Sequence, residues 1–207
     1  MEVASTERVS RYAQKVSANQ RKLFAVLARR VFSSRRRKTC TARHYRREIP
    51  AALRYSRSMD VVRILEALEA SGLVGRPLRR KAMELLSEEP GYAWVGVYAL
   101  HGHELLLDEF VGQATEHTHI PVGKGVCGTA VAENRNMVVD DVRELDNYLA
   151  CSIDTRSEIV VLIRNQDGKV LGQIDADGHE VGAFNEQDEQ ALSQIAEFLA
   201  DRWNELG

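Results

Sequence analysis

The spacing of apolar residues changes at Ala93 in this chain of 207 residues, and that change restricts its possible folds more than any other feature. Before Ala93 apolar residues recur at helical spacing, in residues 19–32, 59–73 and 78–86. After it they follow strand spacing, until residues 185–203 return to a helical stripe. This order predicts an α+β fold, an antiparallel sheet with helices on its flanks. The predicted strands are 93–100, 104–112, 137–139, 158–163 and 169–177, with Asp167-Gly168 as the turn of the last hairpin.

Charge divides the chain in the same region. Residues 1–80 carry 20 Lys and Arg against 6 Asp and Glu, a net charge of +14, whereas residues 81–207 carry 8 against 24, a net charge of −16. A split of this size indicates two parts with different partners. We therefore predict a small, mostly helical basic domain at 1–76 and the α+β domain at 77–207.

The basic part is similar to a winged helix-turn-helix domain in the order of its helices. Its last helix, 59–73, is expected to begin after an N-cap at Ser58, to end at Gly72 and to bury apolar residues that include Leu73. The resemblance implies DNA binding; docking on RNA or on the acidic part of the chain, or a solvated surface, are the alternatives. The cations expected to face DNA are Arg35, Arg36, Arg37, Lys38, Arg54, Arg57 and Arg63.

Cysteine usage and apolar run lengths bear on the location of the protein. Cys40, Cys127 and Cys151 are too few and too scattered for a disulfide scaffold. No signal-peptide pattern opens the chain, and no apolar run approaches the roughly 18 residues that cross a bilayer. We predict a cytoplasmic protein without a membrane partner, in which thiols are more often reactive than structural.

A series of short motifs occurs in a fixed order between residues 78 and 204. The motifs are Trp94-Val95-Gly96-Val97-Tyr98, Ile120-Pro121, Gly123-Lys124-Gly125-Val126-Cys127-Gly128, Ala150-Cys151, Ser157-Glu158-Ile159-Val160-Val161, and Asp175 with Asp177. Together they resemble a GAF domain, and within that superfamily they are similar to the free methionine-(R)-sulfoxide reductases. The ordered series is far more specific than any one glycine motif.

The resemblance implies a thiol reaction without a cofactor. Cys151 would be the nucleophile that attacks the sulfoxide sulfur. A second thiol can convert the resulting sulfenic acid into a disulfide, and Cys127 is the best remaining candidate for it. A thioredoxin-like reductant would then open that disulfide. In the family a further cysteine commonly stands where this chain has His117, and that departure bears on turnover more than on binding.

The acidic and aromatic residues of the motifs suit a small ligand with a positive charge. Glu158, Asp175 and Asp177 would repel one another unless a proton or a cation lay among them, and the α-ammonium of a free amino acid is such a cation. One protonated carboxyl among them, Glu158 or Asp175, would polarise the sulfoxide oxygen. Trp94 and Tyr98 would pack against the thioether methyl group.

Each of these assignments has a structural alternative. Cys127, Trp94 and Tyr98 would serve equally well in an apolar core, and Asp175 and Asp177, which alternate with Ile174 and Ala176, would also fit a solvated strand face. His117 and His119 lie near Cys127, but no metal-binding spacing supports them, so we predict no metal site.

Two functional hypotheses follow. The first is an enzyme that reduces free methionine-(R)-sulfoxide. The second is a DNA-binding transcriptional regulator whose GAF domain senses a similar small amino-acid-like or redox ligand. A homodimer is expected in either case.

Overall fold

The computed structural model describes residues 59–145 and 154–203. Cys40, Cys151 and all the cations expected to face DNA except Arg63 lie outside the described residues. The described elements, in chain order, are α3 (Val61–Ser71), α4 (Gly75–Leu86), β1 (Trp94–His101), β2 (Glu104–Val111), β3 (His119–Pro121), α5 (Gly125–Glu133), β4 (Met137–Val139), the 3-10 turn η1 (Val142–Glu144), β5 (Ser157–Arg164), β6 (Val170–Gly178) and α6 (Glu186–Ala200).

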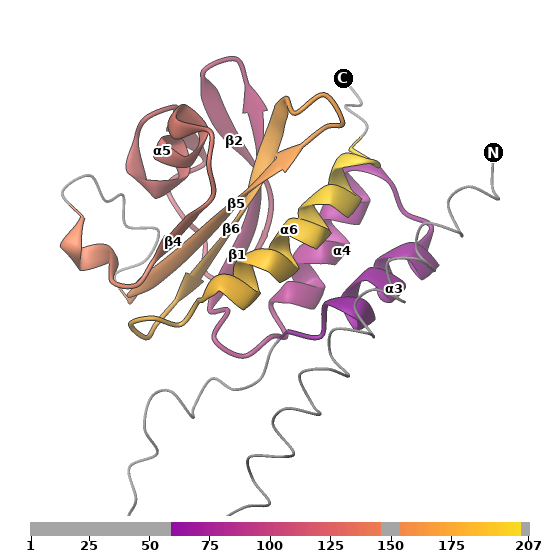
Figure 1. Ribbon diagram of the computed structural model, residues 1–207, viewed down its shortest axis with the longest axis horizontal. Helices are drawn as coiled ribbons and strands as arrows, with labels where there is room; N and C mark the ends of the chain where they lie inside the picture. The colour runs from indigo at the N-terminus through magenta and orange to yellow at the C-terminus, as the bar shows by residue number, and fades with distance from the viewer. Residues whose placement is uncertain (1–58, 146–153, 204–207) are drawn as a thin grey trace, which may run out of the picture. The chain divides into compact units, whose positions relative to one another are not determined.

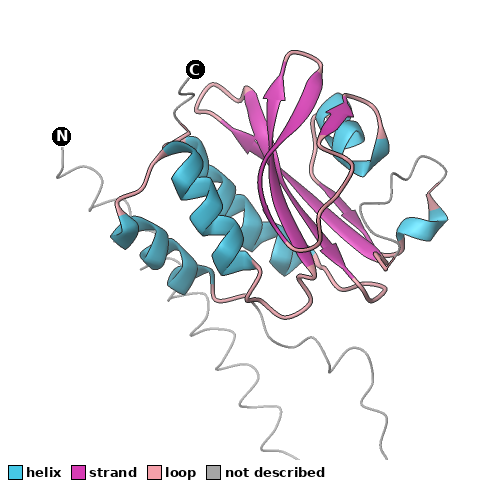
Figure 2. Ribbon diagram, turned by 180° about the vertical axis from the view of Figure 1, so that it is seen from behind, coloured by secondary structure: helices cyan, strands magenta, loops and turns pink. Residues whose placement is uncertain are grey.

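The strands form one antiparallel sheet in the order β3-β2-β1-β6-β5-β4. Helices α4 and α6 cover one face of the sheet, with α3 packed against these two helices, and α5 lies on the other face (Figures 1 and 2). The α+β class with flanking helices is therefore confirmed. The predicted hairpin turn is also confirmed, since β5 and β6 pair on either side of Gly168, which adopts a positive φ of 79°.

Local side-chain contacts fix where the helices begin and end. Asp60 caps α3 by accepting a hydrogen bond from the backbone N–H of Arg63 at 3.2 Å, so the expectation of a cap at Ser58 was wrong. Gly72 ends that helix in the left-handed conformation, as expected. Asn185 and Asp188 form a reciprocal capping box at the start of α6.

The larger apolar core lies between the sheet and the layer of α3, α4 and α6. Ile64 and Leu68 of α3 are buried in it together with Ile174 of β6 and Ile195 of α6. Leu73, expected on the buried side of α3, is 37% exposed because it follows the left-handed turn at Gly72 and leaves the helical stripe. The predicted domain boundary at residue 76 remains a prediction, although α3 packs in the same core as the sheet.

A second, smaller core lies on the opposite face, beneath α5. Its buried members are Trp94, Tyr98, Leu105, Ile120, Val126, Cys127, Ala130, Val160 and Leu162. Buried polar side chains of β5 and β6, among them Glu158 and Asp175, share this face with the smaller core. Within the part of the chain that the structure describes, no helix has the length and apolar character to cross a membrane.

Candidate functional site

The pairing register of the three central strands brings the acidic residues together. Asp177 of β6 pairs with Glu158 of β5 on one side and with Trp94 of β1 on the other. Two residues earlier on β6, Asp175 lies between Val160 and Gly96. Because side chains alternate along a strand, both rows point to the same face, the one that α5 covers.

Helix α5 brings the cysteine to these acids. Its approach depends on Gly128, where an added Cβ would lie 2.4 Å from the carbonyl oxygen of Pro121 in β3. Cys127, in the first turn of α5, is therefore held over the sheet, and its Sγ lies 3.8 Å from Oε1 of Glu158. One oxygen of Asp175 also lies within 4.8 Å of both of these atoms.

All the members of this cluster are buried. The relative exposure is 3% for Cys127, 2% for Glu158, 0% for Asp175 and 1% for Asp177, which excludes the alternative of a solvated strand face. Both carboxylate oxygens of Asp175 and of Asp177 lack a hydrogen-bond partner among the described residues. Buried carboxyl groups without partners are costly, and a ligand that supplies positive charge or donors would remove that cost.

The electrostatics of the acids follow from this burial. Burial raises the pKa of Glu158 well above its usual range, and the charges of Asp175 and Asp177 raise that pKa further. Burial also raises the pKa of Asp175, to about 7, and that of Asp177, which the charge of Asp175 raises further. The cluster is therefore inclined to hold protons near neutral pH unless a cation enters it.

Aromatic side chains border the acids on the β1 side. The ring of Trp94 lies over Gly96, the cross-strand neighbour of Asp175, where an added Cβ would be 2.2 Å from Cη2 of the indole. The indole stacks on Phe110 with ring centroids 5.8 Å apart, and its Nε1 donates a hydrogen bond to the carbonyl oxygen of Gln113 at 3.0 Å. Tyr98, 6.5 Å from Trp94 between ring centroids, donates from its hydroxyl to the carbonyl oxygen of His117 at 2.9 Å.

The structure thus brings together six of the seven residues that the sequence singled out for chemistry or ligand binding: Trp94, Tyr98, Cys127, Glu158, Asp175 and Asp177. The seventh, Cys151, lies outside the described residues. His117 contributes its backbone carbonyl to Tyr98, and His119 is an exposed residue of β3.

Two features of the site were missed from the sequence. Helix α5 was not predicted, because its small, nearly uniform residues form no apolar stripe. Gln173, between Tyr98 and Leu162 on the same face, is 0% exposed. Its side-chain amide nitrogen and oxygen both lack a hydrogen-bond partner among the described residues. The alternation Gln173, Asp175, Asp177 along β6 was the signal that could have identified it.

Such an arrangement can bind a small cationic molecule and expose it to a thiol. Asp175 and Asp177 offer carboxylate oxygens that lack partners among the described residues, the indole supplies an apolar wall, and the sulfur of Cys127 lies close to Glu158 and Asp175. A protonated carboxyl can also donate a proton to an oxygen atom of the ligand.

Comparisons with known proteins agree with this geometry. The family model of the GAF domain matches residues 77–203. The chain is 40% identical over 104 residues to the free methionine-R-sulfoxide reductase of Escherichia coli K12, an alignment that covers 49% of this chain and 61% of that relative. The chain therefore spans less than two thirds of the length of this curated relative.

Two solved structures are similar over more of their length. One is the type II free methionine-R-sulfoxide reductase of Thermoplasma acidophilum, with 38% identity, a TM-score of 0.58, and coverage of 68% of this chain and 94% of that one. The other is the free methionine-R-sulfoxide reductase of Neisseria meningitidis in complex with its substrate, with 34% identity, a TM-score of 0.64, and coverage of 78% and 95%. The chain belongs to the GAF domain family, and free methionine-R-sulfoxide reductases are among its relatives.

Proposed function

We propose that this protein reduces free methionine-(R)-sulfoxide to methionine with thiols as the source of electrons. The observation that carries the proposal is the buried cluster of Cys127, Glu158, Asp175 and Asp177 beside the Trp94 indole. The similarity to reductases of this name supports the choice of substrate.

Binding is proposed to use the carboxylates that lack partners. The α-ammonium group of the free amino acid would donate hydrogen bonds to Asp175 and Asp177, and the thioether end would pack against the indole of Trp94. A methionine residue inside a peptide has an amide in place of that ammonium group. The buried acids would therefore discriminate against peptide-bound methionine sulfoxide.

The chemical step is assigned to Cys151 as the nucleophile. Its thiolate would attack the sulfoxide sulfur while a protonated carboxyl of the cluster, Glu158 or Asp175, donates a proton to the oxygen. The oxygen would leave the substrate as the sulfenic acid of Cys151, with methionine as the product. The raised pKa of Glu158 and of Asp175, caused by burial, supports a carboxyl that holds a proton near neutral pH.

Regeneration is assigned to Cys127 and an external dithiol. The Cys127 thiol would condense with the sulfenic acid, with release of water and formation of a disulfide, and a thioredoxin-like reductant would return both cysteines to thiols. His117 stands where the family commonly has a further cysteine, so in this chain the second thiol would come from the cluster itself.

A turnover assay tests the proposal. Purified protein with dithiothreitol should consume free methionine-(R)-sulfoxide, and should act on neither the (S) epimer nor N-acetylmethionine sulfoxide. Cys151→Ser should abolish consumption, and Cys40→Ser, which removes a thiol outside the GAF match, serves as the matched control. Full activity in Cys151→Ser, or equal activity on the N-acetyl compound, would overturn the proposal.

A second proposal concerns the basic residues 1–76, because a net charge of +14 within the first 80 residues favours an anionic polymer as partner. We propose that this part binds DNA as a winged helix-like domain and that the full protein is a dimer. Arg63 already pairs with Glu88 and Glu89, so the principal contacts are assigned to Arg35, Arg36, Arg37, Lys38, Arg54 and Arg57. Selection from random DNA, followed by binding measurements over a range of salt concentrations, should yield one preferred sequence; binding without any preference would overturn this assignment.

A further inference from the structure

The thiol and two of the acids form a set of possible metal ligands as well as a ligand-binding surface. Cys127, Glu158 and Asp175 come from α5, β5 and β6, and their donor atoms all lie within 4.8 Å of one another. All three residues are at most 3% exposed, and the two oxygens of Asp175 lack a partner among the described residues. Asp177, which is not one of the three, is 1% exposed, lies next to Glu158 in the sheet and has no hydrogen-bond partner for either oxygen among the described residues. A buried carboxylate without a partner is an independent sign that a cation is missing from this place.

The distances are close to those of a tetrahedral zinc site. With Zn–S of about 2.3 Å and Zn–O of about 2.1 Å, a sulfur and an oxygen ligand of one zinc ion are about 3.6 Å apart. The distance between Sγ of Cys127 and Oε1 of Glu158 is 3.8 Å. The oxygen of Asp175 lies within 4.8 Å of both other donor atoms, so a shift of about 1.4 Å or less completes such a set.

The chemistry of the donors selects the kind of metal. Calcium and magnesium prefer six or more oxygen ligands, whereas a thiolate with a few carboxylates suits zinc or cadmium. Asp177, next to Glu158 in the sheet and equally buried, adds a further negative charge to this set. A divalent cation would relieve the mutual repulsion of these groups.

We propose that Cys127, Glu158 and Asp175 bind one Zn²⁺ ion, with loss of the Cys127 thiol proton to solvent. This departs from the sequence-based expectation of no metal site, which considered Glu116, His117 and His119 together with Cys127. The bound ion takes Asp175 away from the α-ammonium group, to which that carboxylate was assigned above together with Asp177, and it holds the second thiol as a thiolate. Zinc is therefore a reversible inhibitor that competes with the amino-acid substrate, a consequence that rests on the proposed function.

Direct titration tests the site without any activity assay. Cd²⁺ added to the reduced full-length chain should produce the ultraviolet absorption of a cadmium–thiolate bond and should saturate at one ion per chain. Zn²⁺ should displace it, and calorimetry should give the same stoichiometry. The double variant Cys40→Ser/Cys151→Ser leaves Cys127 as the sole thiol and should retain this binding.

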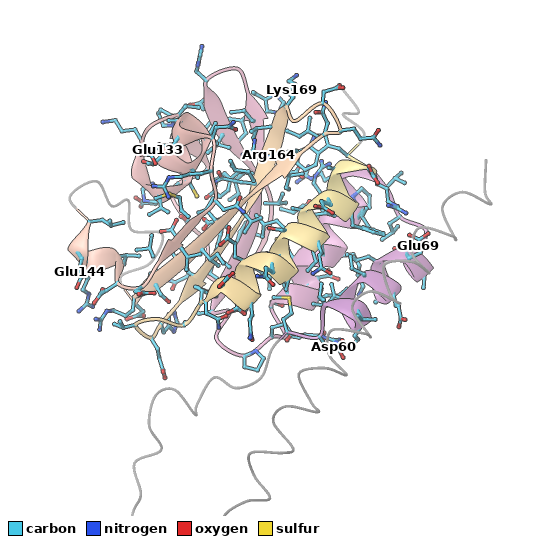
Figure 3. All side chains as sticks on the ribbon, viewed as in Figure 1. Asp60, Glu69, Glu133, Glu144, Arg164 and Lys169 are labelled. Carbon is cyan, nitrogen blue, oxygen red and sulfur yellow. The ribbon has the colours of Figure 1, made fainter. Side chains whose placement is uncertain are left out.

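Single substitutions assign the ligands. Cys127→Ser should abolish the absorption band, and Asp175→Asn should weaken Zn²⁺ binding roughly tenfold or more. Glu133→Gln, at the exposed end of α5 (Figure 3), is the matched control for unspecific attraction of cations and should leave binding unchanged. Circular dichroism of each variant shows whether it is folded. If Cys127→Ser does not fold, the result for Asp175→Asn still decides whether the cluster binds the ion.

Three results would overturn the site: no saturable binding by the wild-type chain, a band that survives in Cys127→Ser, or a band that vanishes in the variant that retains only Cys127. The inhibition experiment separates the two proposals. Binding of Zn²⁺ at Cys127 without loss of reductase activity leaves the metal site standing and contradicts the proposed substrate position. If the metal-free protein has no reductase activity although Zn²⁺ binds at Cys127, the proposed function alone is contradicted.

Discussion

Cys127 and Glu158 meet inside the protein, with 3.8 Å between the thiol sulfur and a carboxylate oxygen. The cysteine comes from a helix and the glutamate from a central strand, and 31 positions separate them in the sequence. Neither side chain is more than 3% exposed. A thiol in this position is shielded from solvent and surrounded by acids, so its chemistry depends on what enters the cluster.

The first prediction concerns the accessibility of Cys127. In the folded, ligand-free protein, iodoacetamide should modify Cys127 at a rate at least about a hundredfold lower than in the chain unfolded by urea. The reason is that modification of a buried thiol requires local opening. Mass spectrometry of peptides after short exposures measures the rate for each cysteine separately. Equal rates in the folded and the unfolded chain would show that the thiol is open to solvent.

The second prediction is a loss of stability as pH rises. The folded state raises the pKa of Asp175 from 3.8 to about 7, and burial raises those of Glu158 and Asp177 as well. Between the unfolded and the folded pKa the native protein binds more protons than the unfolded chain, so the free energy of unfolding decreases with pH. Each unit of difference costs about 1.4 kcal/mol once pH exceeds both values. Urea denaturation from about pH 4 to pH 8 measures this decrease.

Isosteric amides separate this effect from general pH sensitivity. Asp177→Asn and Glu158→Gln should each raise stability at neutral pH and flatten the decrease, because an amide stays neutral. Glu133→Gln, on the exposed end of α5, should leave the profile of the wild-type protein unchanged. A wild-type protein that becomes more stable through this pH range would contradict the assignment.

The third prediction is that a free amino group determines ligand binding. Methionine sulfoxide and methionine should raise the midpoint of thermal unfolding in proportion to the logarithm of their concentration, because a ligand that binds only the native state stabilises it. N-acetylmethionine sulfoxide, which has no ammonium group for Asp175 and Asp177, should not. The amide variant Asp177→Asn should lose most of the shift while remaining folded.

The position of the acids was predictable because strand periodicity is local. Asp175 and Asp177 are two positions apart in an apolar strand, so they must share a face, whatever lies above it. That this face is buried depends on α5, whose short run of small residues has no helical stripe. Its position results from close packing of Gly128 on Pro121, a contact between segments that no local pattern reports.

The ends of α3 show the same limit on a smaller scale. Helical periodicity predicted that the buried stripe of α3 extends to Leu73. The left-handed turn at Gly72 instead directs the chain away from the helix axis, and Leu73 is 37% exposed. Ser58 and Asp60 are both favourable caps by composition, and only the observed hydrogen bond from the Arg63 N–H identifies Asp60. Family resemblance, by contrast, indicated the fold and most of the site directly, since the matched motifs carry the residues that now lie together.

The last prediction concerns the contact between Trp94 and Gly96. An added Cβ at Gly96 would lie 2.2 Å from Cη2 and 2.7 Å from Cζ3 of the indole, so Gly96→Ala must displace the ring from its place beside Asp175. Overpacking of this kind costs about 1–3 kcal/mol, and displacement of the apolar wall should raise KM for methionine sulfoxide.

Trp94→Phe removes the ring atoms that clash with the added methyl group. The double variant Gly96→Ala/Trp94→Phe should therefore be destabilised by less than the sum of the destabilisations of the two single variants. Urea denaturation of the wild-type protein and the three variants completes this cycle. If the changes in the free energy of unfolding were strictly additive, the indole would not occupy the space above Gly96. That result would also contradict the apolar wall proposed for the substrate.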